Sequence, residues 1–436
     1  MQTNFSLTRL ADGDLQEMEQ ILRTCVHCGF CLATCPTYVL LGDELDSPRG
    51  RIYLIKDMLE GDKPASKAVV RHLDRCLSCL SCMTTCPSGV NYMHLIDHAR
   101  GHVAATYVRP RGERLLRRLI LAILPRPKLL RPLLALARLA APLNRFLPKS
   151  LAAFPTLLPS PEFSGESGLQ PGSGIYPALG ARRMRVALLT GCVQESLRPA
   201  IDAATVRLLT RHGIEVVISG DGGCCGALAN HMGEIEAARA AARTNVAAWE
   251  AVINEGGLDA IVINASGCGT MVKDYGFLLR DEPQWAQRAA AVSALARDVS
   301  EIITGIGFVK KAVPAIEGLK VGYLAACSLR HGQKIVDEPV ALLKAAGFDV
   351  VEPGEAHLCC GSAGTYNLLQ PQLAGQLGER KAGRFEALGV GVVAAGNIGC
   401  LVQMAAHVDG PVAHTVELLD WASGGPLPPG LKPGVS

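Results

Sequence analysis

Near its start the chain carries two runs of cysteine residues with identical spacing. In each run three cysteines are separated by two residues, a fourth follows after three more, and a proline comes next. Iron in a [4Fe–4S] cluster binds thiolate sulfur, and a cubane needs one thiolate for each iron. The sequence therefore predicts two [4Fe–4S] clusters with eight metal ligands: Cys25, Cys28, Cys31, Cys35, Cys76, Cys79, Cys82 and Cys86.

The fourth cysteine of such a run leaves along a helix and binds the cluster of the other run. This geometry assigns cluster one to Cys25, Cys28, Cys31 and Cys86, and cluster two to Cys76, Cys79, Cys82 and Cys35. Zinc sites use ligands in pairs, not a three-plus-one run written twice. Residues 1–14 are polar where a secretory signal needs an apolar run, so we expect a cytoplasmic protein with reduced cysteines and no disulfides.

Three polar residues near the first run are open to a structural or a functional interpretation. Arg49 and Arg51 either belong to a solvated loop, which we favour, or lie near a cluster and raise its potential. His27 stands between two predicted ligands, and we expect it to be exposed and not a ligand. Residues 50–60 have apolar side chains at helical spacing, which predicts a helix between the two runs.

A second group of eight cysteines forms an internal repeat. In each copy a Cys-Cys-Gly sequence follows a single cysteine after 32 residues, and a fourth cysteine comes 43 or 40 residues after the pair. The two sets are Cys192, Cys224, Cys225 and Cys268, and Cys327, Cys359, Cys360 and Cys400. Each set is a candidate cofactor-binding site for a metal or further cluster, a redox-active dithiol, or a group of small buried residues, and the sequence leaves these alternatives open.

The residues between these cysteines alternate between strand and helix patterns. Strands are predicted at 185–190, 215–219, 260–264, 320–324, 348–351 and 390–395, and helices at 201–212 and 336–346. In open parallel sheets ligands bind beyond the carboxyl ends of the strands. We therefore expect each copy to bring its four cysteines to one rim, where the glycine after each cysteine pair allows a close approach of the backbone.

Residues 108–150 contain eleven lysine and arginine residues and one acid, whereas the rest of the chain is acidic overall. Apolar side chains occupy one helical face of residues 111–124, and Pro125, Pro127 and Pro132 interrupt the pattern before a second short amphipathic stretch. No apolar run here approaches the roughly 20 residues that span a bilayer. We expect contact with a membrane surface or a partner subunit, and not with nucleic acid, because interleaved aromatic residues are missing.

These patterns predict a multidomain chain. An N-terminal α-helical, bacterial-ferredoxin-like domain with two [4Fe–4S] clusters (1–107) precedes a basic amphipathic segment and linker (108–180). Two α/β Cys-Cys-Gly (cysteine-rich) repeat domains follow (181–312 and 313–425). The linker assignment rests on the proline, glycine and serine residues of 154–178. No flavin or nicotinamide motif has a convincing context, so we assign no catalytic residue to this chain.

Over its whole length the chain resembles the iron–sulfur subunit of bacterial glycolate oxidase (glycolate dehydrogenase). The resemblance rests on the ferredoxin runs, on both Cys-Cys-Gly domains and most specifically on residues 40–56, Leu-Leu-Gly-Asp-Glu-Leu-Asp-Ser-Pro-Arg-Gly-Arg-Ile-Tyr-Leu-Ile-Lys. It implies a complex with flavoprotein subunits, which hold FAD and oxidise glycolate and also D-lactate to 2-oxo acids. This chain, inactive alone, would pass the electrons towards quinone or another membrane acceptor from a peripheral position on the cytoplasmic face of the inner membrane.

Similar motifs also occur in iron–sulfur subunits of anaerobic glycerol-3-phosphate dehydrogenase and in heterodisulfide reductases. The alternative hypotheses are therefore an iron–sulfur subunit of anaerobic glycerol-3-phosphate dehydrogenase, or a heterodisulfide-reductase-like reductase with its own active site at the Cys-Cys-Gly rims. Heterodisulfide reductase domains end in Cys-x-x-Cys, so a fifth cysteine is expected three residues from Cys268 and from Cys400. Those positions hold other residues, namely Ala265, Met271, Asn397 and Gln403. This departure weakens the reductase hypothesis and favours electron transfer.

Overall fold

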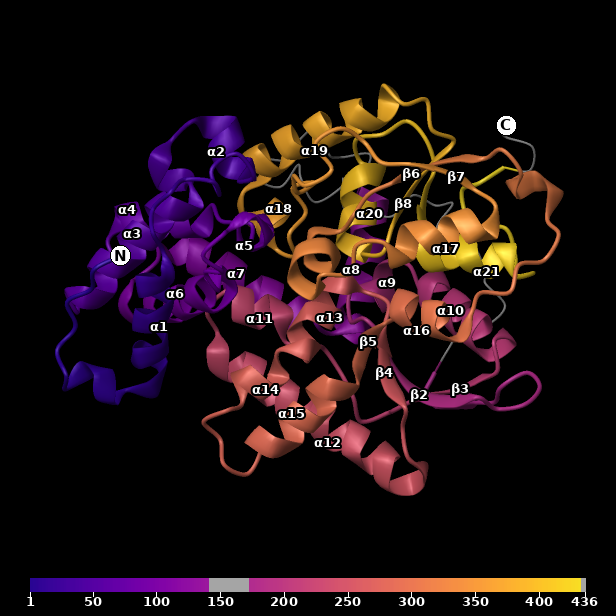
Figure 1. Ribbon diagram of the computed structural model, residues 1–436, viewed down its shortest axis with the longest axis horizontal. Helices are drawn as coiled ribbons and strands as arrows, with labels where there is room; N and C mark the ends of the chain where they lie inside the picture. The colour runs from indigo at the N-terminus through magenta and orange to yellow at the C-terminus, as the bar shows by residue number, and fades with distance from the viewer. Residues whose placement is uncertain (141–171, 433–436) are drawn as a thin grey trace.

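The computed structural model describes residues 1–140 and 172–432, with side chains described up to residue 137 in the first range. Figure 1 shows an N-terminal helical body beside two sheet-containing bodies that lie one above the other. The end of the basic segment and most of the expected linker, residues 154–171, fall outside the described residues.

The N-terminal body is built from helices that surround the two cysteine runs. They are η1 (Arg9–Ala11), α1 (Gly13–Thr24), α2 (Pro36–Leu41), η2 (Glu44–Asp46), α3 (Pro48–Glu60), α4 (Lys67–Asp74), α5 (Ser81–Thr85) and α6 (Tyr92–Thr106). The predicted helix at residues 50–60 is α3, and it begins earlier because Ser47 caps it by accepting a hydrogen bond from the Gly50 amide. One apolar core joins these helices and includes Met18, Leu22, Ile55, Leu73 and Leu95.

The basic segment forms two helices, α7 (Arg111–Ile123) and α8 (Pro127–Ala140). The break expected near Pro125 is present, but the prediction that Pro132 interrupts the pattern is wrong, because Pro132 lies inside α8. Proline removes one helical hydrogen bond, here that of the Lys128 carbonyl. Both residues are exposed, so water can bond that carbonyl and the helix continues.

Each Cys-Cys-Gly copy contains one sheet. In the first copy the strands are β1 (Gly174–Tyr176), β2 (Met184–Leu189), β3 (Ile214–Ile218), β4 (Ala260–Ile263) and β5 (Ala296–Asp298), in the order β1-β3-β2-β4-β5. In the second copy they are β6 (Lys320–Tyr323), β7 (Asp349–Val351), β8 (Val392–Ala395) and β9 (Val412–His414), in the order β7-β6-β8-β9. All pairs are parallel except the antiparallel pair of β1 with β3. The matching strand order confirms the internal repeat.

Helices cover both sheets. In the first copy they are α9 (Gln194–Leu197), α10 (Ala200–Arg211), α11 (Ala227–His231), α12 (Ile235–Gly256), α13 (Ser266–Lys273), α14 (Tyr275–Leu278), α15 (Ala286–Leu295) and α16 (Val299–Ile306). In the second copy they are η6 (Pro314–Ile316), η7 (Ser328–Gln333), α17 (Glu338–Ala346), α18 (Tyr366–Leu369), α19 (Pro371–Glu386), α20 (Ile398–Ala405) and α21 (Thr415–Ala422).

All six strands and both helices that the sequence predicts here are present, with ends displaced by one or two residues. The additional strands β1, β5 and β9 have three residues each, too few for a periodic pattern to emerge. Strand β1 joins the first sheet ahead of residue 181, the boundary that composition suggests.

The two copies share one hydrophobic core. Side chains from both sheets meet those of α10, α16, α17 and α21, which lie between the sheets in Figure 1. The ends of β4 and β8 are also joined directly, because the Ser266 amide donates to the Gly396 carbonyl at 3.2 Å. His414 Nε2 lies 2.8 Å from the Asn264 carbonyl oxygen. The carboxyl ends of the central strands, where the cysteines lie, are therefore held against each other.

Candidate metal centres

The two N-terminal cysteine loops follow the same backbone path. The second and fourth residues after Cys25 are His27 and Gly29, with φ of 57° and 85°, and the corresponding residues after Cys76 are Ser78 and Leu80, with φ of 50° and 60°. Left-handed backbone at non-glycine residues costs of order 1–3 kcal/mol and persists where the surroundings demand it. The same strained turn in both loops directs three cysteines of each run towards one hollow.

Two hollows separate the cysteines into groups of four. The first is lined by Cys25, Cys28, Cys31 and Cys86, and also by Cys82, which lines both hollows. The second is lined by Cys35, Cys76, Cys79 and Cys82. These groups are the two sets that the doubled spacing predicts, since the fourth cysteine of each run reaches the hollow of the other. All four residues of the second group are buried, whereas Cys28 of the first group is exposed.

Hydrogen-bond donors point at the sulfur atoms of the second group. Arg51 Nη1 lies 3.7 Å from Cys35 Sγ, the Tyr92 hydroxyl lies 3.8 Å from Cys76 Sγ, and the Ser78 amide lies 3.5 Å from the same sulfur. Thiolates that bind iron accept such bonds, and hydrogen bonds to cluster sulfurs tune the reduction potential. Four gathered cysteines with donors directed at their sulfurs fit a [4Fe–4S] group.

The prediction that Arg51 belongs to a solvated loop is wrong. Its side chain is 1% exposed, and its Nε donates to the His72 carbonyl at 2.7 Å while Nη2 donates to Thr37 Oγ1 at 3.0 Å. Asp46, which is fully buried, accepts from Arg51 Nη2 at 3.3 Å. The interpretation of a solvated loop is wrong for Arg51 because Ser47 caps α3, and this helix directs Arg51 inwards towards the cysteines.

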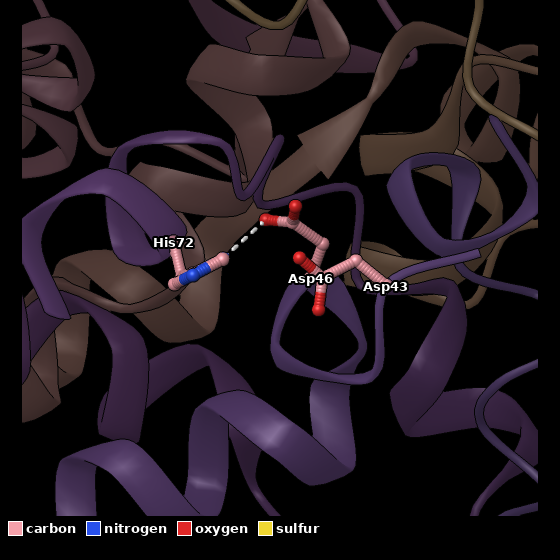
Figure 2. A group of neighbouring side chains, drawn as sticks. All are labelled: Asp43, Asp46 and His72. Atoms are coloured by element: carbon pink, nitrogen blue, oxygen red, sulfur yellow. Dashed lines mark hydrogen bonds and ion pairs between the residues drawn. The ribbon is translucent and has the colours of Figure 1, made fainter. Parts of the chain in front are cut away.

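Asp46 also lies within ligand distance of Asp43 and His72, a group that resembles a cation site. Figure 2 shows the His72 ring directed at the Asp46 carboxylate, at 2.9 Å from Nδ1 to Oδ1. Arg75 Nη1 occupies the other oxygen at 2.6 Å. The guanidinium groups of Arg51 and Arg75 thus bond the two carboxylate oxygens, so Asp46 ties α3, α4 and the second cysteine hollow together.

The other two polar residues near the first run line the first hollow. Arg49 is about one third exposed; its Nε donates to Glu44 Oε1 at 2.8 Å and its Nη1 to the His27 carbonyl at 3.3 Å. The Arg49 guanidinium lowers the pKa of the Glu44 carboxyl. His27 was expected to be exposed and is instead half-buried, because its left-handed backbone folds the loop back against Arg49.

The structure brings the four cysteines of each Cys-Cys-Gly copy together. Cys192 and Cys224 have sulfur atoms 3.5 Å apart, and Cys327 and Cys359 have sulfur atoms 3.8 Å apart. Within each set, hydrogen bonds between neighbouring thiols lower the pKa of one cysteine and raise that of another. Hydrogen bonds from Cys192 and Cys225 lower the pKa of Cys224 to about 3. In the second set, hydrogen bonds from Cys359 and Cys400 lower the pKa of Cys360.

The glycine after each cysteine pair is required by geometry. Gly226 and Gly361 have φ of 85° and 92°, and a Cβ atom at either position would lie 3.0 Å from the Ala238 carbonyl oxygen or 2.6 Å from that of Ala374. The loops therefore press against the first turns of α12 and α19, as the Cys-Cys-Gly pattern predicts. Each set can hold a metal or act as a thiol redox site.

Several residues around these sites were not singled out from the sequence. Asp46 lies in the family-specific stretch at 40–56, close in sequence to Arg49 and Arg51. An acid near two arginines could therefore have suggested a buried ion pair. Thr37 and Tyr92 carried no signal, because a threonine or tyrosine of this kind is indistinguishable from an ordinary core residue until its partner is known.

Within the part of the chain that the structure describes, no helix combines the length and apolar character needed to cross a membrane.

Comparisons with known proteins agree with this architecture. Residues 24–90 match the family model of the 4Fe-4S dicluster domain, and residues 186–273 and 321–405 match that of the Cysteine-rich domain. A crystal structure of a hypothetical protein from Helicobacter pylori matches with a TM-score of 0.54 and 10% identity, covering 95% of this chain and 73% of that chain. This last likeness concerns the fold alone. The predicted fold class, an iron–sulfur domain followed by two cysteine-rich α/β domains, is confirmed.

Two curated relatives carry the same description. The glycolate oxidase iron-sulfur subunit of Escherichia coli (strain K12) is 41% identical over 97% of this chain and 99% of its own length. The probable glycolate oxidase iron-sulfur subunit of Bacillus subtilis (strain 168) is 33% identical over 88% of both chains. The chain is thus an iron–sulfur electron-transfer subunit of an oxidoreductase complex. It belongs to the family of glycolate oxidase iron–sulfur subunits.

Proposed function

We propose that this chain carries electrons from the flavoprotein subunits of a glycolate dehydrogenase to a membrane acceptor such as quinone. The complex oxidises glycolate, and also D-lactate, to the 2-oxo acid on FAD held by the partner subunits. The eight N-terminal cysteines bind two [4Fe–4S] clusters with the crossed ligand sets described above. The observation that carries the proposal is the pair of hollows, lined by five and by four cysteines that come from both runs, with Cys82 in both hollows.

The surface above the first hollow supports docking of a redox partner. Cys28 is exposed there, and the large apolar side chains of Val26, Phe30 and Tyr53 are each 60–65% exposed. Val26, Cys28 and Phe30 line the hollow itself. A partner that covers these side chains would bury apolar surface and bring its own redox group close to cluster one. We assign this face to a flavoprotein subunit.

The helices α7 and α8 support a peripheral position on the cytoplasmic face of the inner membrane. Five of their large apolar side chains stay uncovered, with exposures of 43–62% at Leu115, Leu119, Leu129, Leu133 and Leu136. Exposed basic side chains accompany them, namely Arg111, Arg114, Arg118, Arg126 and Lys128. An amphipathic basic surface of this kind lies in the interface of an anionic bilayer without crossing it.

The test compares the isolated chain with the complex. The chain purified without oxygen should contain about eight irons in its two N-terminal clusters, and more only if the Cys-Cys-Gly sites are filled. It should not oxidise glycolate with an artificial acceptor. Addition of the flavoprotein subunits should restore the reaction. Glycolate oxidation by this chain alone would contradict the division of roles, and four or fewer irons after full reconstitution would contradict the two-cluster assignment.

A further inference from the structure

The second thiol set, Cys327, Cys359, Cys360 and Cys400, lies against the second N-terminal hollow. Cys79, which lines that hollow, and Cys359 belong to one buried apolar cluster that also contains Tyr366, and Cys327 packs against it. A hydrogen bond fastens the same interface, since Thr84 Oγ1 lies 2.7 Å from His331 Nδ1.

Tyr366 lies between the two thiol groups. Its side chain is 5% exposed, and its hydroxyl has no hydrogen-bond partner among the described residues. Its side chain lies in the same apolar cluster as Cys79 of the second hollow and Cys359 of the second thiol set, so it is close to residues of both sites. Leaving a buried donor unbonded costs about 1–3 kcal/mol, and the sulfur atoms of an iron–sulfur group would accept its hydrogen bond.

Among the described residues, the first thiol set shares no apolar cluster with the cysteines of an N-terminal hollow. Its buried residue Cys225 and half-buried Cys268 belong to an apolar cluster formed by residues 187–296 alone. The position six residues after the cysteine pair, which holds Tyr366 in the second copy, holds His231 in the first. His231 is partly exposed and pairs with Asp97 at 3.4 Å. The two copies thus have the same fold and the same cysteines but different surroundings.

We propose that the second thiol set binds a redox-active iron–sulfur group that exchanges electrons with cluster two, whereas the first set stands outside this relay. Cys35, Cys76, Cys79 and Cys82 would hold the group that gives up one electron, and the second set would hold the group that the same electron reduces. No covalent bond forms or breaks. The inference rests on the proposed function because it requires cluster two. It makes the second copy the point where electrons leave the chain, since the flavoprotein is assigned to the face of cluster one.

The experiment uses the full chain, reconstituted with iron and sulfide in the absence of oxygen. Each second-copy variant has a matched variant in the first copy: Cys360→Ser against Cys225→Ser, and Tyr366→Phe against Tyr275→Phe. Tyr275 is the appropriate control because it is also fully buried, and its hydroxyl donates to the Cys225 carbonyl at 2.8 Å. Iron per chain and the midpoint potential of cluster two, followed by electron paramagnetic resonance, are measured for every variant.

We expect the wild-type chain to contain more iron than two clusters require. The Cys360→Ser variant should lose this additional iron, and its cluster-two signal should differ from that of the wild type. Tyr366→Phe should keep its iron and lower the midpoint potential of cluster two or of the second-set group. Cys225→Ser and Tyr275→Phe should leave the cluster-two signal and potential unchanged.

The relay is overturned if cluster two is present in all variants and neither Cys360→Ser nor Tyr366→Phe alters it, or if the first-copy variants alter it equally. A wild-type chain without a cluster-two signal would instead contradict the proposed function. The two failures are therefore distinguished by the wild-type spectrum.

Discussion

The guanidinium of Arg51 lies 3.7 Å from the sulfur of Cys35, and both residues are buried. A positive charge that is removed from water acts strongly on its neighbours, because little solvent screens it. The charges of Cys76, Cys35 and Asp46 together raise the pKa of Arg51, so it stays protonated despite burial. Arg51 is thus a fixed cation beside one of the two cluster sites, and it should favour the reduced form of that cluster.

Arg51→Gln should lower the midpoint potential of cluster two, because the charge that stabilises the added electron is removed. The same change leaves Asp46 with fewer cationic partners, so we also expect a loss of stability of roughly 3–5 kcal/mol. Redox titration by electron paramagnetic resonance measures the potential. Arg49→Gln is the matched control, because Arg49 lines the first hollow and should leave cluster two unchanged. Equal shifts of cluster two in both variants would contradict the assignment.

Crossed ligation predicts that Cys35→Ser damages cluster two although Cys35 belongs to the first run. Cys35 lines the same hollow as Cys76, and Cys86 lines the same hollow as Cys25. Cys35→Ser and Cys76→Ser should therefore lose the same paramagnetic signal, and Cys86→Ser and Cys25→Ser should lose the other. The assignment is wrong if Cys35→Ser gives the spectrum of Cys25→Ser.

Asp202 should make stability depend on pH. Its carboxylate is 3% exposed and accepts from Gln194 Nε2 at 2.7 Å and Asn264 Nδ2 at 2.9 Å, and burial raises its pKa from 3.8 to about 7. The folded chain therefore binds this proton more tightly than the unfolded chain, and the free energy of unfolding falls as pH rises between these two values. Each pKa unit corresponds to about 1.4 kcal/mol, so the penalty at pH 8 is a few kcal/mol.

Asp202→Asn removes the titrating group while keeping the shape of the side chain. The variant should have a higher melting temperature than wild type at pH 8, and the difference should shrink towards pH 4. Asp337→Asn, at an exposed position, should show no such trend. A difference between Asp202→Asn and wild type that is independent of pH would contradict the raised pKa.

Membrane attachment should depend on four basic side chains that are exposed on α7, on α8 and on the turn between them. Arg117 is excluded because it pairs with Asp74 at 3.1 Å, and Arg131 because it pairs with Glu195 at 2.8 Å. Each basic residue near an anionic surface contributes about 1 kcal/mol. Fractionation should therefore find the complex in the soluble fraction, with unchanged iron content, when glutamine replaces Arg114, Arg118, Arg126 and Lys128.

A control variant changes four exposed basic residues elsewhere to glutamine, at Lys67, Arg71, Lys310 and Lys344. It should remain membrane-bound. Attachment should also weaken with added salt, because exposed charges are screened beyond about 10 Å at 0.1 M. Retained membrane binding with loss of the flavoprotein subunits would show that α7 and α8 form a subunit interface.

Much of this molecule was predictable from the sequence because the signals are local. The spacing of Cys25 to Cys35 and of Cys76 to Cys86 specifies two loops of the same kind, and buried strands such as β4 and β8 are continuous apolar runs. The repeat of single cysteine, Cys-Cys-Gly and fourth cysteine revealed two copies of one domain. The short strands β1, β5 and β9 were missed because three residues take their conformation from a neighbouring strand.

Contacts between residues that are distant in the sequence became known only from the tertiary structure. Arg51 turned out to be buried because its partners Asp46, Thr37 and His72 come from other elements, and an isolated stretch of sequence cannot show that a charge will be neutralised. Cys79 and Cys359 are 280 positions apart in the sequence yet share one apolar cluster. The two thiol sets look alike in sequence because their cysteines are identical. They differ in the fold because the N-terminal body packs closely on one of them, and packing between distant segments depends on the shape of the whole chain.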